Sequence, residues 1–135
     1  MKKIYPFLCL VLLLLACNKT NSSNSESLFR ATVVVDYGEE KNMKQIGIQI
    51  PHQITALEAL QYVSTVETHP VGKYVFVSSI DSVKTEIGIN AWYYKVNGES
   101  PGVLAINNML HDEDTVKWIY KTDVCSKTAE NITKK

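Results

Sequence analysis

The segment Trp92–Gly98 reads WYYKVNG, and it decides the fold more than any other part of the chain. Its aromatic and β-branched residues favour a strand, in which alternation places Trp92, Tyr94 and Val96 on one face. Asn97-Gly98 is the strongest short signal for a β-hairpin turn, because both positions accept a positive φ. The segment therefore predicts a strand that ends in a tight turn.

Strand patterns flank this segment on both sides. We expect the WYYKVNG strand to start at Ile87, and Val103–Ile106 to return from its turn. A last strand with alternating apolar residues is expected at Thr115–Lys121. Three further strands are predicted before Ile87 by the same signals, at Leu28–Tyr37, Met43–Ile50 and Lys73–Ile80.

One helix interrupts the strands. Thr55 can cap its first turn while Glu58 reaches back to the amide of the cap, which is the capping-box pattern. Pro70 and Gly72 prevent much extension beyond Glu67. The apolar positions form a single stripe that can cover one face of a sheet, namely Ala56, Leu57, Ala59, Leu60 and Val63.

Without the short return segment Val103–Ile106, the predicted order is β-β-α-β-β-β, which indicates an α+β domain with one helix packed on one face of a mixed sheet. Polar, weakly patterned residues bound the domain at both ends. We expect a single domain at residues 28–124, large enough to bury a core without disulfides or metals. Residues 17–27 are expected to form a tether and residues 125–135 a polar tail.

The first residues have the layout of a secretory signal, with Lys2 and Lys3 before the apolar run Ile4–Ala16. That run is too short for a membrane-spanning helix. Its end, LLAC at residues 14–17, resembles the lipobox of bacterial lipoproteins. The alternative is an ordinary signal peptide followed by an incidental cysteine. The lipobox resemblance implies cleavage after residue 16, a diacylglyceryl group on Cys17 and acylation of the new amine.

A lipid on Cys17 would hold the protein in the cell envelope, facing the periplasm or the cell surface. The polar tether would reach about 5–6 Å × √n, or about 17 Å for its ten residues, so that any ligand has to come to the membrane. Acidic and basic residues number 14 each, and the basic ones are scattered singly. We therefore expect no nucleic-acid partner.

The domain resembles the domain of unknown function 4430 family and the C-terminal domain of transcobalamin and intrinsic factor. Four blocks in the same order carry the resemblance, and they are TALEAL at residues 55–60, Ile80, WYYKVNG at 92–98 and LHDEDTVKW at 110–118. One departure is visible, because family members usually carry glycine where this chain has Glu113.

The resemblance implies a β-grasp fold, with the last strand beside the first in parallel. It also implies binding rather than catalysis. In the vitamin carriers this domain contacts cobalamin only as a lid over a separate helical barrel, and the barrel is absent from this sequence.

No catalytic constellation is visible, so we expect no enzymatic activity and no cofactor. The histidines stand singly in turns, at His52, His69 and His111, and they lack metal-ligand spacing. The acidic run at residues 112–114 has the pattern of a charged turn rather than that of a calcium loop. Cys125 is interpreted as incidental, although a reactive thiol or a ligand remains the alternative.

The aromatic strand and the loop after it are the candidate ligand site, because aromatic rings with hydrogen-bonding tips suit a planar or sugar-like ligand. The vitamin carriers use the matching region for their lid contacts. The candidate residues are Trp92, Tyr93, Lys95, Asn97, Pro101, Gly102 and Val103. The alternative is that the rings only fill the core.

Two functions are open at this point. The first is binding of a small soluble, cobalamin-like ligand. The second is docking on an envelope transporter or complex through an exposed strand edge.

Overall fold

The computed structural model describes residues 27–123. Cys17, the signal segment, Cys125 and the polar tail lie outside the described residues. The helix is α1 (Ala56–Val63), and the strands are β1 (Phe29–Asp36), β2 (Lys44–Ile50), β3 (Val66–Val71), β4 (Tyr74–Ile80), β5 (Val83–Lys84), β6 (Asn90–Val96) and β7 (Asp114–Thr122). Within the described range, no helix is long and apolar enough to cross a membrane.

The strands form two sheets. A four-stranded sheet has the order β2-β1-β7-β6, and a three-stranded sheet has the order β3-β4-β5. β1 and β7 are parallel, with Val33 opposite Val116 and Val35 opposite Trp118. This is the parallel pairing of first and last strands that the family resemblance implies. The small α+β class with one helix and mostly strands is confirmed.

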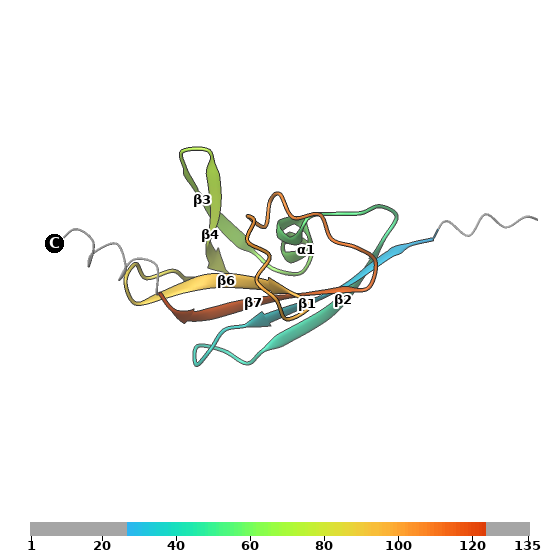
Figure 1. The fold of residues 1–135 in the computed structure, drawn as a ribbon. Helices are drawn as coiled ribbons and strands as arrows, with labels where there is room; N and C mark the ends of the chain where they lie inside the picture. The colour runs from blue at the N-terminus through green and yellow to red at the C-terminus, as the bar shows by residue number, and fades with distance from the viewer. Residues whose placement is uncertain (1–26, 124–135) are drawn as a thin grey trace, which may run out of the picture.

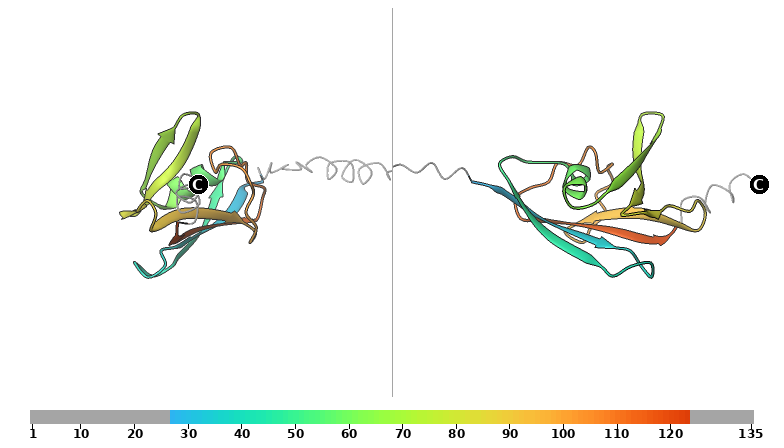
Figure 2. Two further views of the ribbon diagram at one scale, coloured as in Figure 1. Left: turned by 60° about the vertical axis from the view of Figure 1, so that its left-hand side comes forward. Right: turned by 180° about the vertical axis from the view of Figure 1, so that it is seen from behind.

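All other layers lie on one face of the four-stranded sheet. α1, the hairpin of β3 and β4, and the long segment between β6 and β7 rise from this inner face (Figure 1). Both turned views in Figure 2 show the same one-sided arrangement. The core fills the space under α1, and its largest fully buried side chains include Leu60, Ile80, Leu110, Val33 and Val35.

The helix forms as its sequence predicts. The Thr55 hydroxyl accepts a hydrogen bond from the Glu58 amide at 3.2 Å, and the Glu58 carboxylate accepts one from the Thr55 amide at 2.7 Å. The capping box is therefore complete and satisfies two amides of the first turn. The predicted stripe is buried at Ala56, Leu57, Ala59 and Leu60, and Val63 packs against the core.

The hairpin turn after β6 is also present. Asn97 and Gly98 have φ of 50° and 84°, the positive pair that a two-residue type I′ turn requires. Asn97 is fixed further by its side chain, which donates to Asp114 Oδ1 at 2.7 Å and accepts from the Thr115 amide at 2.9 Å. The side chain thus joins the turn to the start of β7.

Two strand predictions are wrong. Val103–Ile106 forms no strand, because Pro101 has no amide to continue a ladder after the turn. β6 begins at Asn90, since Gly88 turns the chain with φ of 80° and Ile87 lies exposed before it. The sequence also did not predict β3 at residues 66–71, where Pro70 was interpreted only as a limit to the helix. β3 is a sheet edge, where a proline needs no amide partner.

Glu113 occupies the position where the family resemblance implies glycine, and its φ is 69°. A left-handed backbone costs a non-glycine residue about 1–2 kcal/mol. The Glu113 carboxylate lies 2.8 Å from Arg30, but this pair is exposed and contributes little.

We expect Glu113→Gly to raise the free energy of unfolding by about 0.5–1 kcal/mol, measured by urea denaturation. Glu113→Gln is the control, because it removes the charge and keeps the strained backbone. Equal stability of the two variants would show that backbone strain is not the cause.

Candidate functional site

A groove of about 740 Å³ runs along the free edge of β6. Five consecutive β6 residues line it, from Ala91 to Lys95. Side chains of a strand alternate between its two faces, so a groove that touches five in a row must follow the strand edge. The volume lies in the range of organic-ligand sites.

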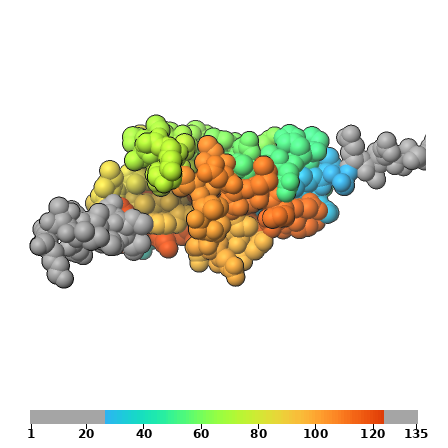
Figure 3. All heavy atoms as spheres, turned by 45° about the horizontal axis from the view of Figure 1, so that its top comes forward, coloured from blue at the N-terminus to red at the C-terminus, as the bar shows by residue number. Residues whose placement is uncertain are grey.

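Two segments far apart in sequence form the walls. One wall is the β3–β4 hairpin, with Val71 and Phe76, which are 51% and 47% exposed. The other is the segment after the type I′ turn, with Pro101, Val103 and Leu104. In Figure 3 the yellow-green hairpin and the orange segment around residues 100–112 rise beside each other over the sheet. Both walls are mainly apolar.

The second wall is held in place by an aromatic stack. Tyr94 stacks on Trp118 with ring centroids 5.2 Å apart, and its hydroxyl donates to the Val103 carbonyl at 2.6 Å. Burial raises the pKa of the Tyr94 hydroxyl, which therefore stays protonated as a donor at neutral pH. Because of this bond, the loop position depends on β6 itself.

Polar groups are few in the groove. Thr85 lines it, but its hydroxyl oxygen is buried and has no hydrogen-bond partner among the described residues, so this atom is not exposed to the groove. His69 and Ser78 lie on the hairpin side, Ser100 lies on the side of the loop after β6, and the charged lining residues are Lys95, Lys121 and Asp123.

Six of the seven sequence candidates line the groove, namely Trp92, Tyr93, Lys95, Pro101, Gly102 and Val103. Asn97 does not, because its side chain is engaged by the turn. Trp92 is also a core residue, only 8% exposed. The alternation is as predicted, because Trp92, Tyr94 and Val96 pack on the core while Tyr93 lies on the outer face with Lys121 over its ring at 4.8 Å.

The basic residues are less scattered than the sequence indicates. Lys95 and Lys117 are direct cross-strand partners on the outer face of β6 and β7, and Lys121 lies on the same face. Asp36 pairs with Lys117 at 2.9 Å, which leaves a modest positive surplus beside the groove.

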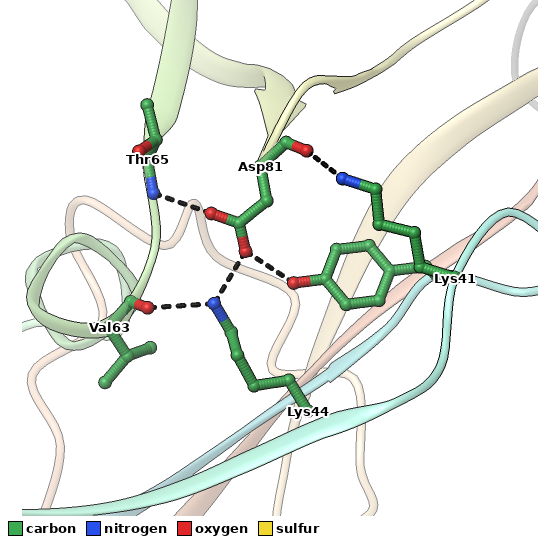
Figure 4. A network of polar contacts seen from close by, with 6 residues as sticks. Lys41, Lys44, Val63, Thr65 and Asp81 are labelled. Atoms are coloured by element: carbon green, nitrogen blue, oxygen red, sulfur yellow. Dashed lines mark hydrogen bonds and ion pairs between the residues drawn. The ribbon is translucent and has the colours of Figure 1, made fainter.

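The base of the hairpin wall is fixed by Asp81, where β4 ends. Its carboxylate accepts hydrogen bonds from the Tyr37 hydroxyl at 2.5 Å, from Lys44 at 2.6 Å and from the Thr65 amide at 2.9 Å. Lys41 donates to its carbonyl. Figure 4 shows Lys44 of β2, Lys41 of the segment between β1 and β2, and Thr65 of the segment between α1 and β3 around Asp81.

The backbone at Asp81 also adopts an uncommon conformation. Asp81 and Ser82 have φ of 47° and 73°, which makes a second two-residue turn, between Ile80 and Val83. Burial alone would raise the pKa of the Asp81 carboxyl, but the hydrogen bonds from Lys44, Tyr37 and Thr65 outweigh it and hold the pKa at about 2. Asp81 is therefore ionised at any physiological pH and positions the hairpin.

No cluster of three or more histidine, cysteine or acidic side chains suited to a metal occurs within residues 27–123. The acidic side chains at residues 112–114 already have partners within the fold. Asp112 and Glu113 pair with Arg30, and Asp114 accepts hydrogen bonds from Asn97 and the His111 amide.

The hairpin residues Val71 and Phe76 are part of the groove that the sequence did not indicate. Phe76 was expected in a strand and Val71 in none, and only the three-dimensional placement of β3 and β4 shows that both line a groove. A weak signal was present in Tyr74 and Phe76, two large apolar residues on one face of a strand next to a glycine turn.

A family model described as domain of unknown function 4430 matches residues 54–122. The chain belongs to this family. The match confirms the resemblance noted in the sequence, and it spans α1, both groove walls and β7.

Solved structures extend the comparison. Sixteen chains match, among them the crystal structure of a candidate metal-binding protein from Ruminococcus gnavus, at 16% identity and a TM-score of 0.56. The alignment covers 70% of this chain and 98% of that protein. At this identity the likeness concerns the fold. A search of curated proteins finds no match.

Proposed function

We propose that this protein is a non-enzymatic, lipid-anchored binding domain of the cell envelope, and that its site is the groove along β6. The observation that carries the proposal is the groove itself, with its two mainly apolar walls and its few polar and charged lining residues. Sites for organic ligands have this composition of apolar walls with a few polar groups.

The β-grasp arrangement is part of the proposal. Its support is the parallel pairing of β1 with β7 and the position of α1 across one face of their sheet. In such an arrangement the edge strand β6 remains open to a ligand.

The lipid anchor on Cys17 fits the geometry of the domain. β1 begins at one end of the molecule, and the β3–β4 hairpin lies toward the other (Figures 1 and 2). The groove would therefore face away from the membrane. Incorporation of a labelled fatty acid that persists in Cys17→Ser would disprove the anchor.

The ligand we propose first is a small soluble molecule of the cobalamin type. It is supported by the resemblance to the vitamin carriers, whose lid contacts come from the region after the aromatic strand. That region supplies Pro101, Gly102 and Val103 to the groove.

Calorimetric titration with cobalamin and cobinamide tests this choice. We expect micromolar binding of at least one of them, and about a tenfold loss of affinity in Phe76→Asp, because a charge on the apolar wall must be desolvated. Met43→Asp is the matched control, since Met43 is 59% exposed and lies outside the groove. It should bind like the native chain.

Absence of binding by both corrinoids at micromolar concentration would rule out the corrinoid class. Equal losses in Phe76→Asp and Met43→Asp would instead place the site elsewhere.

A further inference from the structure

The open edge of β6 carries unpaired backbone groups. Among residues 27–123, β7 is the only strand beside β6. The Asn97 amide donates to the Thr115 carbonyl at 2.8 Å, so Asn97 faces β7, whereas the Val96 amide donates away from β7 to Glu99 at 2.9 Å. In an antiparallel pair this direction alternates by residue. The amides and carbonyls of Trp92 and Tyr94 therefore point away from β7.

This free stretch is short and has defined ends. At one end Asn90 exchanges hydrogen bonds with Glu86, and at the other Val96 exchanges them with Glu99. Between them only Trp92 and Tyr94 offer outward amides and carbonyls, four groups in all. They lie in the groove, whose lining includes both residues.

The groups around the edge suit one kind of partner. Unpaired strand amides and carbonyls bind another extended backbone, and apolar walls accept its alternate side chains. The charged lining residues are two lysines, Lys95 and Lys121, and one carboxylate, Asp123, so a modest positive charge remains. The partner that matches these features is an extended peptide with apolar residues at alternate positions and an acidic residue beside them.

We propose that the groove takes such a peptide segment, which adds to the four-stranded sheet as a strand next to β6. This inference rests on the proposed function only in taking the groove as the binding site, and it assigns the groove to a peptide instead of the corrinoid proposed above.

A second copy of the chain fits the edge less well. The β3–β4 hairpin and the segment around residues 100–104 stand at either side of it. A second β6 would have to bring its own hairpin and loop into the same space. A peptide has no such walls.

The test uses pools of fluorescein-labelled, end-blocked hexapeptides with valine, isoleucine or threonine at alternate positions and one terminal glutamate. Binding is measured as the change in fluorescence anisotropy of each pool when the full chain is added. Each peptide of the best pool is then N-methylated, either on one alternate set of amides or on the other. We expect one set to lose about tenfold in affinity, as the loss of one or two hydrogen bonds predicts, and the other set to bind unchanged. The NMR amide signals of Trp92 and Tyr94 should shift on binding.

A parallel titration with the apolar dye 8-anilinonaphthalene-1-sulfonate, on the native chain and Phe76→Asp, separates the two proposals. If the dye binds in the groove and no peptide pool binds, or if both methylated sets bind alike, strand addition is overturned and the groove remains a binding site. If neither dye nor peptide binds, both proposals fail. Concentration-dependent dimers that perturb the same two amides would assign the edge to a second copy and overturn the peptide.

Discussion

Asp81→Asn is expected to lower the free energy of unfolding by about 2–3 kcal/mol, because Lys44 and the Tyr37 hydroxyl lose their shared charged acceptor. The side chains of Lys44 and Asp81 are only 29% and 24% exposed, so water replaces the lost contact poorly. Asparagine tolerates the positive φ at this position, so the change tests the network rather than the turn.

Urea denaturation of the native chain and Asp81→Asn measures the effect, and Asp36→Asn serves as control. Asp36 pairs with Lys117 on the outer sheet face, where both are partly exposed, so its loss should cost at most about 1 kcal/mol. Similar losses in the two variants would show that the Asp81 network contributes no more than a surface pair.

The same variant has a distinct pH dependence. The folded-state pKa of Asp81 is about 2, below its ordinary value of 3.8. A lowered pKa contributes stability above the ordinary value, and this contribution is lost as the pH falls from about 4 to about 2. The stability of the native chain should therefore fall more steeply across this interval than that of Asp81→Asn. Parallel pH profiles would contradict the assignment.

Trp92→Ala should be the most damaging single change, with a loss of about 3–5 kcal/mol. The Trp92 ring lies 5.8 Å from Tyr37 and 5.1 Å from Tyr120, and its indole donates to the Val83 carbonyl at 2.9 Å. The substitution opens a cavity between the sheets and leaves that carbonyl unpaired. Single domains have a total stability of about 5–15 kcal/mol, so the variant should be close to unfolding at 37 °C.

Trp92→Phe is the matched control, because it retains a ring and removes only the indole donor and part of the volume. We expect a loss of about 1–2 kcal/mol for it. Thermal melts followed by circular dichroism compare the three proteins. Equal melting temperatures for native and Trp92→Ala would contradict the core position of this ring.

Local signals account for the parts of the fold that the sequence predicted. The capping box of Thr55 and Glu58 and the turn at Asn97-Gly98 are satisfied within a few residues, so their patterns are visible in the chain itself. The last strand was predictable because Val116, Trp118 and Tyr120 alternate onto the core.

Long-range placement accounts for what was missed. The sequence did not predict β3, and Pro70 fits in this strand because β3 is a sheet edge. Phe76 and Val103 line one groove from distant segments, and no pattern in the sequence around either residue indicates this. No local pattern indicates the role of Asp81 either, because its partners are remote in sequence. They are Tyr37 after β1, Lys44 in β2 and Thr65 after α1.

The candidate ligand residues were predicted in part. The aromatic strand and the loop after it do line the groove, since the alternation and the turn that place them are local features. The opposite wall depends on how the β3–β4 hairpin stands on the sheet, and Asp81 fixes that through contacts between remote residues.

The most direct test of the groove as the binding site is an NMR titration of the ¹⁵N-labelled chain with 8-anilinonaphthalene-1-sulfonate. We predict that the perturbed amides fall on β6, on the β3–β4 hairpin and on residues 100–104, and that Phe76→Asp weakens the effect at all three. Perturbations confined to the β1–β2 turn or to the β2 edge, or none at all, would contradict the groove as the site of binding.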